Sequence, residues 1–85
     1  MATRMFKGDI KQDLFCQIII ELLKSHNRSA SELKQEAKSI YKERCKKKIH
    51  GQLTISDKEY YYRIRRLKHE GLIQKRGQEY IMRDR

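Results

Sequence analysis

The residues best suited to chemistry lie in the last third of the chain, between Ser56 and Met82. Residues 57–70 have the spacing of a helix, and Lys, Arg and Tyr side chains fill the side that would face outward. Gly71 ends this pattern, and the segment after it is predicted to form a hairpin with Lys and Arg near its tip. Ammonium and guanidinium groups donate strong hydrogen bonds to phosphate oxygens. A basic helix joined to a basic hairpin is therefore typical of a surface that contacts nucleic acid.

The charge of the whole chain favours the same kind of partner. Its 85 residues include 21 Lys and Arg against 11 Asp and Glu, a net charge of +10 at pH 7. Such an excess on one small domain produces a positive field over much of the surface, and phosphate backbones are the commonest partner for it. The alternatives are a generally solubilising charge and, less favoured, attraction to an anionic membrane surface.

Catalytic and metal sites find little support in the sequence. The three histidines stand singly, and Cys45 and His50 are not spaced like the tight cysteine pairs of structural zinc sites. No glycine-rich loop suited to cradling phosphate is present, and the carboxylates Glu32 and Glu36 have the spacing of a helix surface. We therefore expect no enzyme activity, no metal, no cofactor and no small-molecule effector.

The sequence also predicts an intracellular location. No apolar run is long enough to span a bilayer, and no apolar segment of the secretory type follows the basic residues Arg4 and Lys7. Two cysteines do not make a disulfide framework. We expect a cytoplasmic, nucleoid-associated protein with no membrane partner.

Three helices and a hairpin would position the basic residues. A capping residue followed three positions later by a carboxylate or amide recurs at three predicted helix starts. These pairs are Asp9 with Gln12, Ser29 with Glu32 (or a start at Ser31), and Ser56 with Glu59. The predicted helices are about 9–25, 30–47 and 57–70, after a basic arm at 1–8 and with a short extended piece at 52–55. Gly71 suits the end of the third helix, and Gly77-Gln78 favours a two-residue turn in a hairpin at about 72–83.

The first predicted helix is apolar over most of its circumference. Ile10, Leu14, Ile18 and Leu22 line one face, which Phe15 and Ile19 widen, and three more apolar residues lie on another side: Cys16, Ile20 and Leu23. A small domain has little surface to cover them all, so we expect a second copy to pack here as a homodimer. Two Cys16 thiols could then meet in an intermolecular disulfide. The alternative is a central core helix covered by the chain's own hairpin.

The order of helix, helix, extended piece, helix and hairpin resembles a winged helix-turn-helix domain, from about Asp9 to Met82. The most specific part is Ser56 to Ile73. A capping serine comes first, then Tyr60, Ile64 and Leu67 at inward spacing, and then Glu70-Gly71-Leu72-Ile73. Small transcription regulators of bacteria, archaea and archaeal viruses or plasmids share this pattern. The resemblance implies one domain at 9–85, mainly α with a small β-hairpin.

The resemblance further implies that helix 57–70 enters the major groove of double-stranded DNA and that the wing at 75–78 lies on the backbone or in the minor groove. Arg can pair with guanine edges, and Lys is suited to phosphate. The residues assigned to bases are Lys58, Tyr61, Tyr62 and Arg65. Those assigned to the DNA backbone are Arg66, Lys68, Lys75 and Arg76.

Some of these side chains have a structural alternative. Tyr61 or Tyr62 could pack against the second helix, and Arg63 could pair with Glu59 or Glu70 on its own helix.

The predicted function is sequence-specific DNA binding by a dimeric transcriptional regulator. One alternative is a non-specific architectural binder of DNA or RNA that uses the same charges. Another is a winged-helix adaptor whose exposed tyrosines anchor a protein partner.

Overall fold

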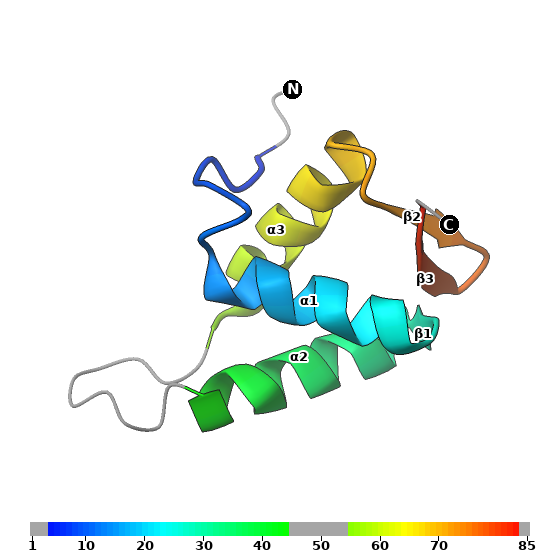
Figure 1. Ribbon diagram of the computed structural model, residues 1–85, viewed down its shortest axis with the longest axis horizontal. Helices are drawn as coiled ribbons and strands as arrows, with labels where there is room; N and C mark the ends of the chain where they lie inside the picture. Colours follow the sequence, from blue (N-terminus) through cyan, green and yellow to red (C-terminus); the bar gives the residue numbers. More distant parts are fainter. Residues whose placement is uncertain (1–3, 45–54, 84–85) are drawn as a thin grey trace.

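Three helices and a small antiparallel sheet form the described part of the chain (Figure 1). The computed structural model describes residues 4–44 and 55–83. Its elements are α1 (Leu14–Ser25), β1 (Arg28–Ser29), α2 (Ala30–Arg44), α3 (Asp57–His69), β2 (Ile73–Arg76) and β3 (Glu79–Met82). The sheet order is β1-β3-β2. This layout has the expected fold class and is compatible with a winged helix; most of the predicted extended piece at 52–55 lies outside the described residues.

The core gathers around α1, which lies between α2 and α3 (Figure 1). Side chains from every helix and from the hairpin close this core, and all of the following are buried: Phe15, Ile18, Ile19, Leu23, Leu33, Ala37, Tyr60, Ile64, Leu67, Ile73, Tyr80 and Met82. The spacing of Tyr60, Ile64 and Leu67 correctly predicted the inward edge of α3. Among the described residues, no helix has the length and apolar character needed to cross a membrane.

The first helix starts later than the sequence predicted. Its N-cap is Asp13, whose carboxylate accepts a hydrogen bond from the Cys16 amide at 2.9 Å. The predicted cap, Asp9, instead organises a turn in which its carbonyl accepts the amides of Gln12 and Asp13. Both aspartates can cap a helix by sequence. Asp13 is favoured because it also binds Arg63 of α3, at 2.9 Å.

The two later helix starts follow the predicted pattern more closely. Ser29 and Glu32 form the reciprocal bonds of a capping box, at 3.2 and 3.3 Å. Ser56 accepts the Glu59 amide at 3.2 Å, but the Glu59 carboxylate binds Arg63 instead of completing a box. Of the predicted helix 30–47, residues 45–47 lie outside the described part.

The end of α3 and the hairpin turn both use glycine in the left-handed region. Gly71 has φ +78°, and the Leu72 amide returns to the Leu67 carbonyl. Gly77 has φ +63° and, with Gln78, joins the paired residues Arg76 and Glu79. The predicted two-residue turn is confirmed.

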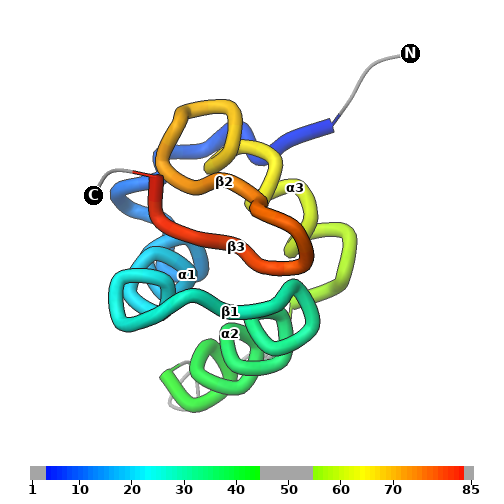
Figure 2. The backbone as a smooth tube through the Cα atoms, turned by 90° about the vertical axis from the view of Figure 1, so that its right-hand side faces the viewer, coloured from blue at the N-terminus to red at the C-terminus, as the bar shows by residue number. Residues whose placement is uncertain are grey.

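Strand β1 was not predicted, because a strand of two residues is too short to show an alternating apolar and polar pattern in the sequence. This strand lies beside β3 (Figure 2), and its Arg28 pairs with Tyr80. The guanidinium of Arg28 is buried: it donates to the carbonyls of Leu22 and His26 and to the Glu36 carboxylate. Arg28 thereby ties the end of α1 to α2.

Replacing Arg28 by Met should lower the free energy of unfolding by about 2 kcal/mol, because the charged hydrogen bonds that Arg28 donates to the Leu22 and His26 carbonyls and to Glu36 are lost. Urea unfolding followed by circular dichroism measures this loss. The matched control is Arg44→Met, which breaks an exposed ion pair with Glu21 and should cost less than about 1 kcal/mol. Equal losses in the two variants would contradict the role given to Arg28.

Candidate nucleic-acid interface

Burial of one edge of α3 determines which of its side chains face outward. Because Tyr60, Ile64 and Leu67 point into the core, residues at the opposite helical positions are turned away from it. These outward residues are Lys58, Tyr62, Arg65 and His69, and we call them the outer row. Tyr62 is half-buried and the other three are exposed. Lys58, Tyr62 and Arg65 were predicted to contact bases, so the fold brings them together on one face.

The fourth predicted base contact, Tyr61, leans toward α2. The residue is 44% exposed, and its ring stands edge-on to Tyr60 with the Lys34 ammonium 5.6 Å from the ring centroid. Lys34 also binds Asp57, at 3.3 Å. Lys38 forms a second ion pair with the same carboxylate. Hydrogen bonds from Lys38 and Lys34 lower the pKa of Asp57 below its ordinary value. The start of α3 is thereby fastened to α2, and the charge of the Asp57 carboxylate is balanced by two lysines.

The N-terminal arm lies against α3 (Figure 1). The Phe6 amide donates to the Tyr62 carbonyl at 3.0 Å. Arg66 donates to the carbonyls of Phe6 and Gly8, at 2.8 and 3.0 Å. Arg65 donates to the Arg4 carbonyl at 3.3 Å. Residues 4–8 are therefore a docked segment, which we call the docked arm.

Arg66 has a role in the fold that the sequence did not predict. Besides holding the docked arm, it binds the Glu70 carboxylate at 2.9 Å, and its side chain is 23% exposed. The predicted phosphate contact would compete with these bonds. Lys68, Lys75 and Arg76, the other predicted backbone contacts, are exposed.

Arg63 is the centre of a second set of contacts. Its guanidinium binds Asp13 at 2.9 and 3.2 Å and Glu59 at 2.7 Å, and lies 4.4 Å from the centroid of the Phe6 ring. The predicted pairing with Glu59 is confirmed, whereas Glu70 pairs with Arg66. Burial acts to raise the pKa of Asp13, but hydrogen bonds from Arg63 and the Cys16 amide lower it below its ordinary value.

The roles of Phe6, Asp13 and Arg63 together were missed. The one available signal was an aromatic residue, Phe6, between the basic residues Arg4 and Lys7. An aromatic ring inside a basic segment can pack while its neighbours stay in solvent.

The wing adjoins α3 because the chain passes directly from the helix into β2 (Figure 1). Lys75 and Arg76 are exposed near the tip, and the Lys75 ammonium lies 6.0 Å from the centroid of the buried Tyr80 ring. The Gln78 carbonyl accepts the Ala30 amide, which ties the tip to the start of α2. The basic residues of the hairpin are therefore presented on a braced turn.

The residues predicted to form a dimer interface are mostly inside the chain's own core. The side chains of Phe15, Cys16, Ile19 and Leu23 are at most 1% exposed, which contradicts their assignment to a surface. The alternative, a central core helix, is correct for these four. Burial raises the pKa of the Cys16 thiol to about 12, and a thiol with no exposed surface cannot reach a second copy.

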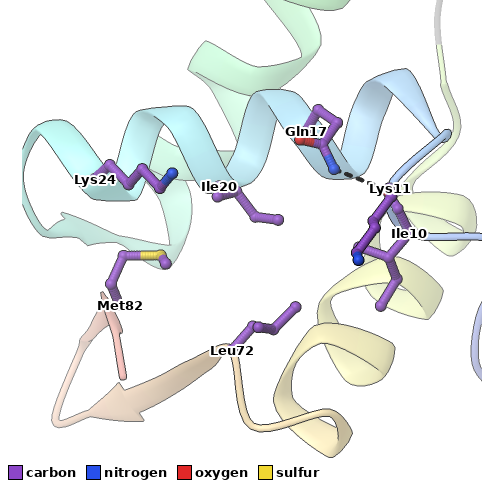
Figure 3. A pocket seen from close by; sticks show the side chains of 7 residues that line it. All are labelled: Ile10, Lys11, Gln17, Ile20, Lys24, Leu72 and Met82. Carbon is purple, nitrogen blue, oxygen red and sulfur yellow. Dashed lines mark hydrogen bonds between the residues drawn. The ribbon is translucent and has the colours of Figure 1, made fainter. Parts of the chain in front are cut away.

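Ile20, the fifth of these residues, does lie at the surface. It lines an open groove of about 510 Å³ together with Ile10, Leu72, Met82, Gln17, Lys11 and Lys24 (Figure 3).

Within residues 4–44 and 55–83, no group of three His, Cys, Asp or Glu side chains could hold a metal ion. Cys45 and His50 lie outside these ranges.

Comparisons with protein-family models, with curated proteins and with solved structures found no match to this chain. Arguments about its function therefore depend on its own residues.

Proposed function

We propose that this chain binds double-stranded DNA, with α3 in the major groove and the β2–β3 wing against the backbone or minor groove. The observation that carries the proposal is the outer row of α3. Its members Lys58, Tyr62, Arg65 and His69 include two permanent cations and no acid, and the nearby Asp57 is held by two lysines of α2. The major groove is wide enough to admit an α-helix, and basic, hydrogen-bonding side chains on the outer face of such a helix can reach base edges there.

Sequence preference would come from Arg65. An Arg can donate to both acceptors of a guanine edge, which identifies that base among the four. The bond from Arg65 to the Arg4 carbonyl occupies one nitrogen of the guanidinium, and the residue is exposed. A chain that reads bases in this way would act as a transcriptional regulator in the cytoplasm.

Selection of bound sites from random duplex DNA tests this function. We expect one recurring sequence with at least one guanine whose replacement weakens binding. Recovery of unrelated sequences would favour the non-specific binder. The protein adaptor is favoured by the exposed ring of Tyr61, and it predicts no salt-sensitive binding to DNA at all.

The homodimer stays part of the proposal, with its surface reduced to Ile20 and the groove around it (Figure 3). Sedimentation equilibrium should then give twice the mass of one chain, and Ile20→Glu should give the mass of one chain because a buried carboxylate is costly. Leu14→Glu is the matched control, since Leu14 is on the same helix, is 37% exposed and does not line the groove. A wild-type chain that sediments as a monomer at all concentrations would refute this part.

A further inference from the structure

The docked arm carries two basic side chains to the edge of the proposed DNA surface. We infer that Arg4 and Lys7 bind phosphates of the duplex beside α3, so that the docked arm is a fixed part of the interface. This inference rests on the proposed function and adds a second contact segment to it.

The docked arm is held through its backbone, which leaves its basic side chains available. Carbonyls of Arg4, Phe6 and Gly8 accept from arginines of α3, and the Phe6 amide donates to α3 in return. Arg4 and Lys7 are exposed, and neither has a carboxylate partner among residues 4–44 and 55–83. Two cations with no carboxylate partner among the described residues are thus carried on a segment whose backbone is bound to α3.

The arginines that hold the docked arm are themselves restrained. Arg63, under the Phe6 ring, is bound by Asp13 and Glu59, and Arg66 is bound by Glu70. The position of the arm is therefore set by the folded domain before any ligand binds. A preordered segment loses little conformational entropy on binding.

The location of the docked arm specifies what its cations would meet. It contacts α3 at Tyr62, Arg65 and Arg66, beside the outer row that the proposal places in the major groove. Groups flanking a helix in that groove face the phosphates along its edge, and such contacts orient the protein without reading sequence.

A docked arm could instead block α3, and replacing Phe6 distinguishes the two roles by the sign of the effect. Phe6→Ala removes the ring from Arg63 and should loosen the arm. If the arm contributes phosphate contacts, the variant binds duplex DNA several-fold more weakly, and Phe6→Tyr, which keeps the ring, binds as the wild type does. If the arm blocks α3, Phe6→Ala binds more tightly, which would overturn the inference.

The number of phosphates contacted can be measured separately, through the salt dependence of binding. Each neutralised phosphate contributes about 0.9 to the slope of log affinity against log salt concentration. The double variant Arg4→Gln/Lys7→Gln should reduce the magnitude of that negative slope by about 1.8. Both side chains are exposed, so the melting temperature should not change.

The matched control is Lys42→Gln/Arg44→Gln, which removes the same charges from the last turn of α2. Its slope should equal that of the wild type. If the wild type binds duplex DNA and the arm and control variants have equal slopes, the inference about the docked arm is refuted while the proposed function stands. A wild type that shows no salt-dependent binding would refute the proposed function and this inference together.

Discussion

Replacing Arg65 by Ala is expected to abolish most of the preference for the selected DNA site. Loss of a bidentate contact to guanine removes about 1–3 kcal/mol of discrimination, or roughly 5- to 150-fold in affinity for the preferred site. Affinity for unrelated duplexes should fall much less, because only one positive charge is lost. Competition between the selected site and random duplex, measured by fluorescence anisotropy, gives the two affinities.

The matched comparison is the wing variant Lys75→Ala/Arg76→Ala. These residues are predicted to contact the backbone, so affinity for all duplexes should fall by a similar factor and the ratio between them should be kept. If Arg65→Ala and the wing variant weakened binding to all sequences alike, the assignment of α3 to base contacts and of the wing to backbone contacts would be wrong.

Replacing Arg63 by Leu is expected to destabilise the fold strongly. The side chains of Arg63 and Asp13 are only 11% and 17% exposed, so the variant leaves a mostly buried carboxylate without its partner. Removing one member of such a pair costs about 3 kcal/mol. Urea unfolding measures the loss, and the exposed pair Arg44–Glu21 provides the control through Arg44→Leu, with a cost below about 1 kcal/mol.

The double variant Asp13→Asn/Arg63→Leu isolates the unpaired charge. Asparagine keeps the N-cap of α1 but carries no charge, so the double variant should recover part of the stability lost in Arg63→Leu. No recovery, or a loss in Arg63→Leu as small as that of Arg44→Leu, would show that this pair does not hold α1 to α3.

The same pair makes the stability of the fold depend on acid pH. Because the folded pKa of Asp13 is lowered, its ionised form stabilises the fold at pH values above the ordinary carboxyl pKa of about 3.9. This contribution is lost as the pH falls through the lowered folded pKa. Asp13→Asn should lose less stability than the wild type over that acid range.

Features set by neighbouring residues could be predicted from the sequence. The inward edge of α3 follows from the spacing of Tyr60, Ile64 and Leu67. Among the described residues, the glycines with positive φ stand at positions where short-range geometry requires them. These signals act over a few residues, so no knowledge of the tertiary structure is needed to interpret them.

Features decided by distant residues could not be predicted. The choice between Asp9 and Asp13 as the helix cap depends on Arg63, fifty residues beyond Asp13. Arg66 has the sequence context of a phosphate contact, yet it binds carbonyls of Phe6 and Gly8 about sixty residues away. The apolar circumference of α1 correctly indicated that most of this helix is buried. It did not indicate that the chain's own helices and hairpin bury most of it.

The salt dependence of binding to duplex DNA tests the central claim most directly. Of the four predicted backbone contacts, Lys68, Lys75 and Arg76 are exposed, whereas Arg66 is bound within the fold. These three contacts rise to five if the docked arm contributes two. Affinity should then fall by roughly 40- to 500-fold between about 50 and 200 mM salt, with a slope of log affinity against log salt of about −2.7 to −4.5. An affinity independent of salt, or no binding to duplex DNA at low salt, would contradict the account.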